Sequence, residues 1–136
     1  MLETSKFIYT YLLTVPVFFL VDMVWLGVVA KKYYAQQLGE LLSKNVNWTA
    51  ATVFYLSYIF GIMWFAVLPG LEDNSLKTVI LNGALFGGLA YATYDLTNLA
   101  TLKDWPTQLV FVDIAWGIVL SSVVGTASYY IALWIR

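Results

Sequence analysis

The sequence contains no cysteine and no histidine. Disulfides, thiolate nucleophiles, zinc sites built from these residues and imidazole acid–base catalysis are therefore excluded. Charged residues make up only 11% of the 136 residues, whereas hydrophobic residues make up 61%. A soluble domain carries about 25% charged residues, so this chain has too few charges to cover a globular surface in water. The composition predicts a membrane protein whose chemistry depends on Asp, Tyr, Asn, Ser, Thr or Lys.

The sequence also lacks an excess of charge of either sign. Seven Lys and Arg residues stand against eight Asp and Glu residues, which gives a formal net charge of -1. Nucleic-acid binding depends on a surplus of basic residues that neutralise phosphates. Nucleic acid is therefore excluded as a main partner, and the lipid bilayer is the expected surrounding of the chain.

Four apolar stretches are long enough to cross a bilayer as helices. Such a helix needs about 20 mostly apolar residues to span the hydrocarbon core. The pattern predicts an all-α, four-helix transmembrane bundle that forms a single polytopic domain over residues 1–136. Its helices are expected at about residues 7–30, 48–68, 76–99 and 106–134.

Helix-capping residues mark three of the expected helix starts. Asn47 and Ser75 stand at N-cap positions, and Pro106 stands at an expected first helical position, where its missing N–H costs nothing. The first connection mixes charged residues with tyrosines and leucines. This pattern fits either a short helix in the headgroup region over residues 33–44 or an irregular loop.

Three aspartates lie inside the expected spanning segments, namely Asp22, Asp95 and Asp113. A carboxylate near the bilayer centre costs about 2.5 to 3.5 kcal/mol on insertion scales, so each needs an offsetting role. Each acid lies near the helix end that faces the first or the third connection. We therefore expect the three acids to lie in the same leaflet.

Other residues extend these acids into faces at helical spacing. Trp25 and Trp116 each stand three residues after an acid, and small residues recur every fourth position in the last two helices. The expected ligand-binding residues are Asp22, Trp25, Tyr91, Tyr94, Asp95, Asn98, Asp113 and Trp116. The expected helix-packing residues are Gly83, Gly87, Gly88, Gly117, Ser121 and Gly125.

Several motifs are similar to those of one family. They are Tyr11-Leu12-Leu13-Thr14-x-Pro16, Asp22-x-x-Trp25-Leu26-Gly27, Tyr94-Asp95-Leu96-Thr97-Asn98, Trp105-Pro106 and Val112-Asp113-x-x-Trp116-Gly117. With them the chain resembles the bacterial family of predicted membrane proteins named domain of unknown function twenty-one seventy-seven. The resemblance implies a small four-helix inner-membrane protein without an established activity. It also implies a lipid-related role, because genes of this family often neighbour lipid-modification genes.

Three classes of function remain open. The first is binding or translocation of a lipid-like or amphipathic small molecule at an intramembrane acidic and aromatic site. The second is a lipid-modifying enzyme with Asp95 as acid or base and Tyr94 as proton donor. The third is a structural or accessory subunit. Binding or transport is favoured over an enzyme, because the sequence contains no nucleophile–base pair and no cofactor motif.

No cofactor and no metal ion are expected, because no tight spacing of metal ligands supports a site. A homodimer that packs through a glycine stripe is expected for so small a bundle. The positive-inside rule weakly favours both termini outside. Lys31, Lys32, Lys44 and Lys103 flank the first and third connections, against Lys6, Lys77 and Arg136 at the opposite ends.

Overall fold

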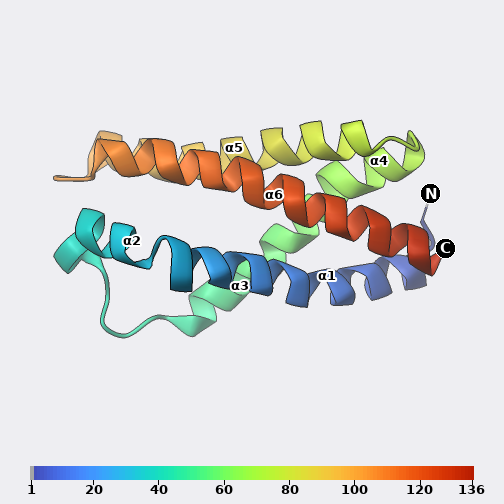
Figure 1. Ribbon diagram of the computed structural model, residues 1–136, viewed down its shortest axis with the longest axis horizontal. Coiled ribbons are helices and arrows are strands. Elements are labelled where there is room, and N and C mark those ends of the chain that lie inside the picture. The colour runs from blue at the N-terminus through green and yellow to red at the C-terminus, as the bar shows by residue number, and fades with distance from the viewer. Residues whose placement is uncertain (1) are drawn as a thin grey trace.

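The computed structural model describes residues 2–136, and every regular element within them is helical. The described helices form four long segments. These run along the molecule, and the two termini lie at the same end (Figure 1). A π-helical turn ends the first segment, and a second one interrupts the second segment. The elements are α1 (Thr4–Val24), η1 (Trp25–Val29), α2 (Lys31–Leu38), η2 (Gly39–Leu41), α3 (Trp48–Ile62), η3 (Met63–Val67), α4 (Leu68–Glu72), α5 (Leu76–Thr101) and α6 (Thr107–Ile135).

Three of the four segments are long and apolar enough to cross a membrane. They are Thr4–Val29, Trp48–Glu72 and Thr107–Ile135, with mean hydropathies of 2.3, 1.9 and 1.9. The fourth, α5, has 26 residues but is more polar. Because α5 lies alongside α6 (Figure 1), a bilayer that α6 crosses also surrounds α5. The predicted all-α bundle of membrane type is confirmed, with α5 as its most polar member.

Glycines bring α5 and α6 into direct backbone contact. A Cβ atom added to Gly87 would lie 2.1 Å from the carbonyl oxygen of Gly117, and one added to Gly83 would lie 3.0 Å from that of Ser121. No side chain fits at Gly87 without moving backbone. Gly88 faces the side chain of Ile118, and Gly125 faces Val79 and Ile62. The small-residue faces of these helices therefore pack within the chain.

The helix starts follow from local capping. The side chains of Asn47 and Ser75 accept hydrogen bonds from the backbone N–H groups of Ala50 and Thr78 at 3.0 and 3.2 Å. Both residues were expected as N-caps. Pro106, expected at the first helical position, is instead the N-cap residue of α6, because its extended backbone (φ −71°, ψ 123°) precedes the first helical turn at Thr107.

The second long segment continues beyond its expected end at residue 68. A proline cannot donate a backbone hydrogen bond, so the carbonyl four residues before Pro69, that of Phe65, lacks its usual helical partner. The side-chain amide of Asn82 on α5 donates to this carbonyl at 3.1 Å. The helix is thus carried through Pro69 to Glu72 by η3 and by a contact from a neighbouring helix.

The first connection contains a true but shorter helix than the expected 33–44. It begins at Lys31, directly after η1, and gives way at Gly39 to the single turn of η2. Gly39 has φ +51°, a backbone conformation that glycine adopts without strain, and this ends the helix. Residues 42–47 then return to α3 without regular structure, apart from bends.

The main hydrophobic core cluster lies toward the end of the bundle that carries the termini. It includes Ile62, Met63 and Val124, all without exposed surface. In contrast, none of the residues of α3 before Tyr58 is buried. The first half of α3 leans away from α5 and α6, as the diagonal path of this segment in Figure 1 shows. A hollow therefore opens at the end of the bundle that carries α2.

Candidate functional site

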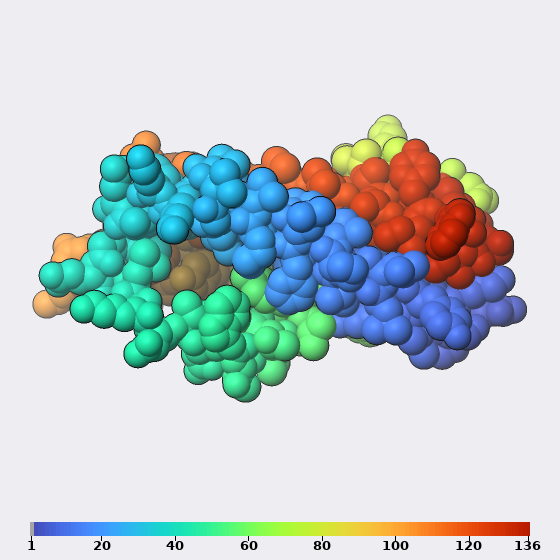
Figure 2. All heavy atoms as spheres, turned by 60° about the horizontal axis from the view of Figure 1, so that its bottom comes forward, coloured from blue at the N-terminus to red at the C-terminus, as the bar shows by residue number. Residues whose placement is uncertain are grey.

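A cavity of about 460 Å³ occupies this hollow. Its volume lies within the range of small-molecule sites, roughly 300 to 1,000 Å³. It opens between α3 and the α1–α2 region, with α5 visible at its floor (Figure 2). The lining residues are Asp22, Leu26, Tyr34, Ala51, Phe54, Tyr55, Ala90, Tyr91, Tyr94, Asp113 and Trp116.

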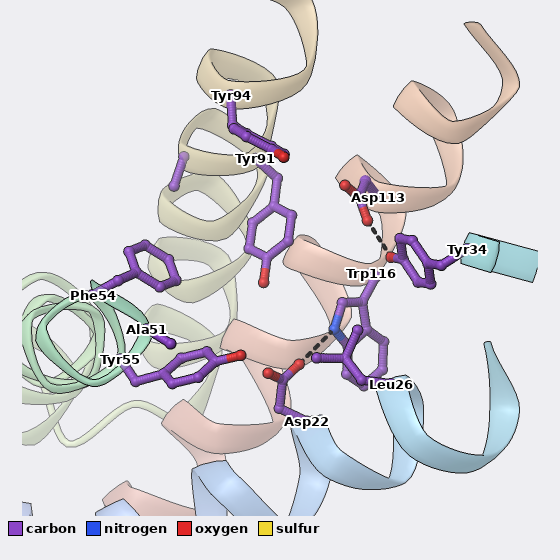
Figure 3. Close-up of a pocket in the computed structure, with 11 residues that line it drawn as sticks. Asp22, Leu26, Tyr34, Ala51, Phe54, Tyr55, Tyr91, Tyr94, Asp113 and Trp116 are labelled. Atoms are coloured by element: carbon purple, nitrogen blue, oxygen red, sulfur yellow. Dashed lines mark hydrogen bonds between the residues drawn. The ribbon is translucent and has the colours of Figure 1, made fainter. Parts of the chain in front are cut away.

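Asp22 on α1 joins three helices at one side of the cavity. Its side chain is only 3% exposed. The indole Nε1 of Trp116 on α6 donates a hydrogen bond to Asp22 Oδ1 at 3.2 Å. The hydroxyl of Tyr55 on α3 points toward the same carboxylate (Figure 3). The acid is thus partly satisfied by neutral donors and still faces the cavity.

Asp113 on α6 is the second acid of the cavity, and it is held by a residue of the first connection. The hydroxyl of Tyr34 donates a short hydrogen bond to Asp113 Oδ1, and it accepts one from Trp25 Nε1 at 3.1 Å. Burial, together with this bond to Asp113, raises the pKa of Tyr34 above its ordinary value of 10.0. At neutral pH the hydroxyl is therefore a neutral donor, and its bond to Asp113 holds α2 over the end of the cavity.

The two expected tryptophans form a stacked pair. The rings of Trp25 and Trp116 lie parallel within 8°, with centroids 4.5 Å apart. Only Trp116 faces the cavity, because Trp25 lies behind it and borders a smaller surface groove with Leu20 and Val21. The pair fixes the orientation of the Trp116 indole, and with it the hydrogen bond to Asp22.

Tyr91 projects from α5 into the centre of the cavity. Its hydroxyl points into the space between Asp22 and Trp116 (Figure 3). It makes no side-chain hydrogen bond to any residue that the structure describes. Tyr94, one turn further along α5, lies at the rim, is 53% exposed and packs edge-on against Trp105. Tyr91 is therefore placed to meet a guest, whereas Tyr94 borders the entrance.

Asp95 and Asn98, both expected in the ligand site, do not line the cavity. Asp95 has no exposed surface, since it points at α6, where the carboxyl of Asp113 and the indole of Trp105 are its polar neighbours. Neither of its oxygens has a hydrogen-bond partner within residues 2–136. Asn98 lies beside Tyr94 instead. Asp95 therefore does not border the cavity, whereas the enzyme alternative places it beside the reacting group.

The cavity is acidic, aromatic and free of basic side chains. Two carboxylates line it, and no lysine or arginine does. In the part of the chain that the structure describes, no three acids are grouped closely enough to hold a metal ion. Asp22, Asp95 and Asp113 nevertheless lie at the same end of the bundle, with two of them in one cavity.

Six lining residues were not singled out in the sequence. Tyr34 lies in the first connection, and no periodicity indicates that this segment folds back on Asp113. Tyr55 lies in a segment without an acid, although its spacing from Tyr58 places both hydroxyls on one helix face. The others are the apolar residues Leu26, Ala51, Phe54 and Ala90, which look like ordinary lipid-facing or packing positions.

The sequence of the chain matches one protein family. Residues 7–130 match the family model described as "Predicted membrane protein (DUF2177)". No curated protein and no solved structure matches the chain. The matched region contains every residue that lines the cavity. The chain therefore belongs to the DUF2177 family of predicted membrane proteins, as its motifs indicated.

Proposed function

We propose that this membrane protein binds a lipid-like or amphipathic small molecule in the cavity between α1, α3, α5 and α6. The observation that carries this proposal is the cavity itself, because its apolar walls end on two carboxylates and a tyrosine hydroxyl. Leu26, Phe54 and Ala90 offer an apolar surface to a chain, whereas Asp22 and Asp113 lie where a polar head would sit. Such a division matches an amphiphile.

The cost of the polar groups supports binding over a purely structural role. Buried acids in a membrane are expensive, and packing alone is served by small or apolar residues, as the glycine contacts of α5 and α6 demonstrate. The hydroxyl of Tyr91, which makes no side-chain hydrogen bond within residues 2–136, adds a further polar atom to the cavity. A guest that meets these groups would supply the missing partners.

The shape of the bundle favours binding over translocation. A guest can reach the cavity from the side, because the first half of α3 has no buried residue and leaves a gap toward α1 (Figure 2). The opposite end is filled by fully buried core residues such as Ile62, Met63 and Val124. A passage across the bilayer would require this core to open, whereas binding requires no such change.

Native mass spectrometry on detergent-purified protein, combined with lipid extraction, tests the proposal. Ala90→Trp places a large side chain in the cavity, and Leu89→Trp, at a neighbouring position that is 61% exposed, is its matched control. We expect a discrete adduct on the wild type and on Leu89→Trp that is absent from Ala90→Trp. Equal retention by all three proteins, with helical circular dichroism preserved, would overturn the proposal.

We further propose that the protein lies in the bacterial inner membrane with both termini outside. The support is the lysine distribution, since the end that carries α2 has four basic residues and the end with the termini has three. The cysteine-free chain allows single-cysteine labelling at exposed positions. An impermeant maleimide should label Asp73→Cys in intact spheroplasts, and Ser43→Cys only after lysis. The reverse pattern would show the opposite orientation.

A further inference from the structure

We infer that the guest of the cavity carries a positively charged amine head group. This inference rests on the proposed function, since it concerns the same cavity. Its basis is the imbalance between hydrogen-bond donors and acceptors around the polar end. The chain places two carboxyl groups there and no basic side chain among the described lining residues, so a cationic guest would supply the counter-charge.

Two donors that face the cavity are already engaged, whereas the Tyr91 hydroxyl makes no side-chain hydrogen bond within residues 2–136. Trp116 Nε1 donates to Asp22, and the Tyr34 hydroxyl donates to Asp113. The Asp113 carboxylate has more accepting sites than the Tyr34 hydroxyl fills, its other polar neighbour is the carboxyl of Asp95, and the Tyr91 hydroxyl can also accept. An ammonium group donates hydrogen bonds and accepts none, so it matches this set of open acceptors.

Asp95, which neighbours Asp113 and does not line the cavity, adds a third acid to this end of the bundle. This side chain is fully buried, both of its oxygens lack a hydrogen-bond partner in the described chain, and the carboxyl of Asp113 is its neighbour. No lysine or arginine lines the cavity. Charges interact strongly in such a low-dielectric setting, so a cation bound at Asp113 would relieve both acids.

The aromatic walls fit the same head group. Tyr55, Tyr91 and Trp116 surround the space beside Asp22 (Figure 3). A cation is attracted to the faces of tryptophan and tyrosine rings, and this attraction is larger where water is excluded. An anionic phosphate head would instead meet two carboxylates, with no basic side chain to offset the repulsion. The geometry therefore separates amine amphiphiles from acidic ones.

Matched amphiphiles that share a dodecyl chain test the inference on the wild-type protein in phosphatidylcholine nanodiscs. The probes end in a primary ammonium group, an uncharged hydroxyl group of similar size, or a phosphate. Native mass spectrometry would measure the apparent Kd of each. We expect the cation to bind at least roughly tenfold tighter than the uncharged isostere, as for one charge-assisted contact, and the phosphate not to bind.

Charge-removing variants then locate the head group. Asp113→Asn and Asp22→Asn should weaken binding of the cation by roughly tenfold and leave the uncharged probe unaffected. Asp104→Asn is the matched control, because this exposed residue lies at the same end of the bundle but outside the cavity. The comparison of probes on the wild type remains decisive if a variant does not fold.

The remaining outcomes separate this inference from the proposed function. If the uncharged or phosphate probe binds as tightly as the cation, and Ala90→Trp abolishes that binding, the amine inference is wrong and the cavity is still a binding site. If no probe binds stoichiometrically to the wild type, and no native adduct is found, the proposed function itself fails. Unchanged cation binding in both Asp113→Asn and Asp22→Asn would also overturn the amine inference.

Discussion

The indole of Trp116 donates a hydrogen bond to Asp22 across 3.2 Å, which links α6 to α1 between residues 94 positions apart. Trp116 also stacks on Trp25, which stands three positions after Asp22 on the same helical segment. This stacking holds the Trp116 N–H in place beside Asp22. The two acids of the cavity are each held by a neutral aromatic donor, Trp116 for Asp22 and Tyr34 for Asp113.

Trp116→Phe tests this link. The substitution keeps an aromatic ring against Trp25 but removes the N–H group, so buried Asp22 loses a donor. We expect the free energy of unfolding to fall by about 1–3 kcal/mol. Thermal unfolding in detergent, followed by circular dichroism, measures the change. Trp64→Phe is the control, since Trp64 is 53% exposed and makes no side-chain hydrogen bond to the described residues. An equal effect of both substitutions would contradict the role of the Trp116 N–H.

Tyr34→Phe should release α2 from the bundle. It removes the hydroxyl that bonds to Asp113 and Trp25, whereas Tyr33→Phe removes a buried hydroxyl without a partner in the described chain. Hydrogen exchange of residues 31–38 measures the docking of α2. We expect about tenfold or more faster exchange in Tyr34→Phe, in line with a bond to a charged group, and no acceleration in Tyr33→Phe. Identical exchange in both variants would show that α2 is held by packing alone.

The same tyrosine predicts the dependence of α2 docking on high pH. Burial and the bond to Asp113 raise the pKa of Tyr34 in the folded state above its ordinary value of 10.0. The folded state then holds the proton more tightly than the unfolded state, so this stabilisation is complete below pH 10 and is lost progressively above it. Thermal unfolding of the wild type and Tyr34→Phe, compared between pH 8 and pH 11, should show the difference between them shrink as pH rises. A constant difference would contradict the assignment.

Asn82→Ala should destabilise the second long segment. It leaves the Phe65 carbonyl without its donor, and we expect a loss of about 1–3 kcal/mol in the free energy of unfolding. Pro69→Ala restores a backbone N–H at the position that normally bonds to Phe65. The two substitutions should therefore be non-additive, with a smaller effect of Asn82→Ala in the Pro69→Ala background. Strict additivity in thermal unfolding would show that Asn82 acts elsewhere.

Gly87→Ala should force α5 and α6 apart. Its new methyl group would lie 2.1 Å from the Gly117 carbonyl oxygen, a clash that only a shift of backbone relieves. We expect a destabilisation of about 1–3 kcal/mol or more, typical of overpacking. Gly27→Ala is the matched control, because nothing lies within 4 Å of its Cβ position. Equal thermal stability of the two variants would contradict the close contact.

Much of this architecture could be predicted from the sequence, because membrane helices can be identified by their length and apolar composition. The capping roles of Asn47 and Ser75 follow from local chemistry, and the shared end of the three acids follows from their distance to the helix ends. The expected helix end at Pro69 was wrong. Asn82 of α5 donates to the Phe65 carbonyl that Pro69 leaves without a partner, and no pattern in the neighbouring sequence indicates this contact.

The cavity could be predicted only in part. Asp22, Tyr91, Tyr94, Asp113 and Trp116 were expected at a site and do line the cavity. Asp95 lies on the same helical stripe as Tyr91 but turns toward α6, because which neighbour covers a given position depends on how the helices cross. Tyr34 could not be placed, since the path of a connection that folds back is set by tertiary contacts.

The direct backbone contact of α5 and α6 has a mechanical consequence. These two helices carry Tyr91, Asp113 and Trp116 on a closely packed wall, because the α5 backbone at Gly87 lies against the Gly117 carbonyl and the Tyr91 ring packs on Gly117. The facing wall, the first half of α3, has no buried anchor. We expect the closely packed wall to make the site selective for the head group. The less tightly packed wall at α3 should accept guests whose apolar chains differ in width and length.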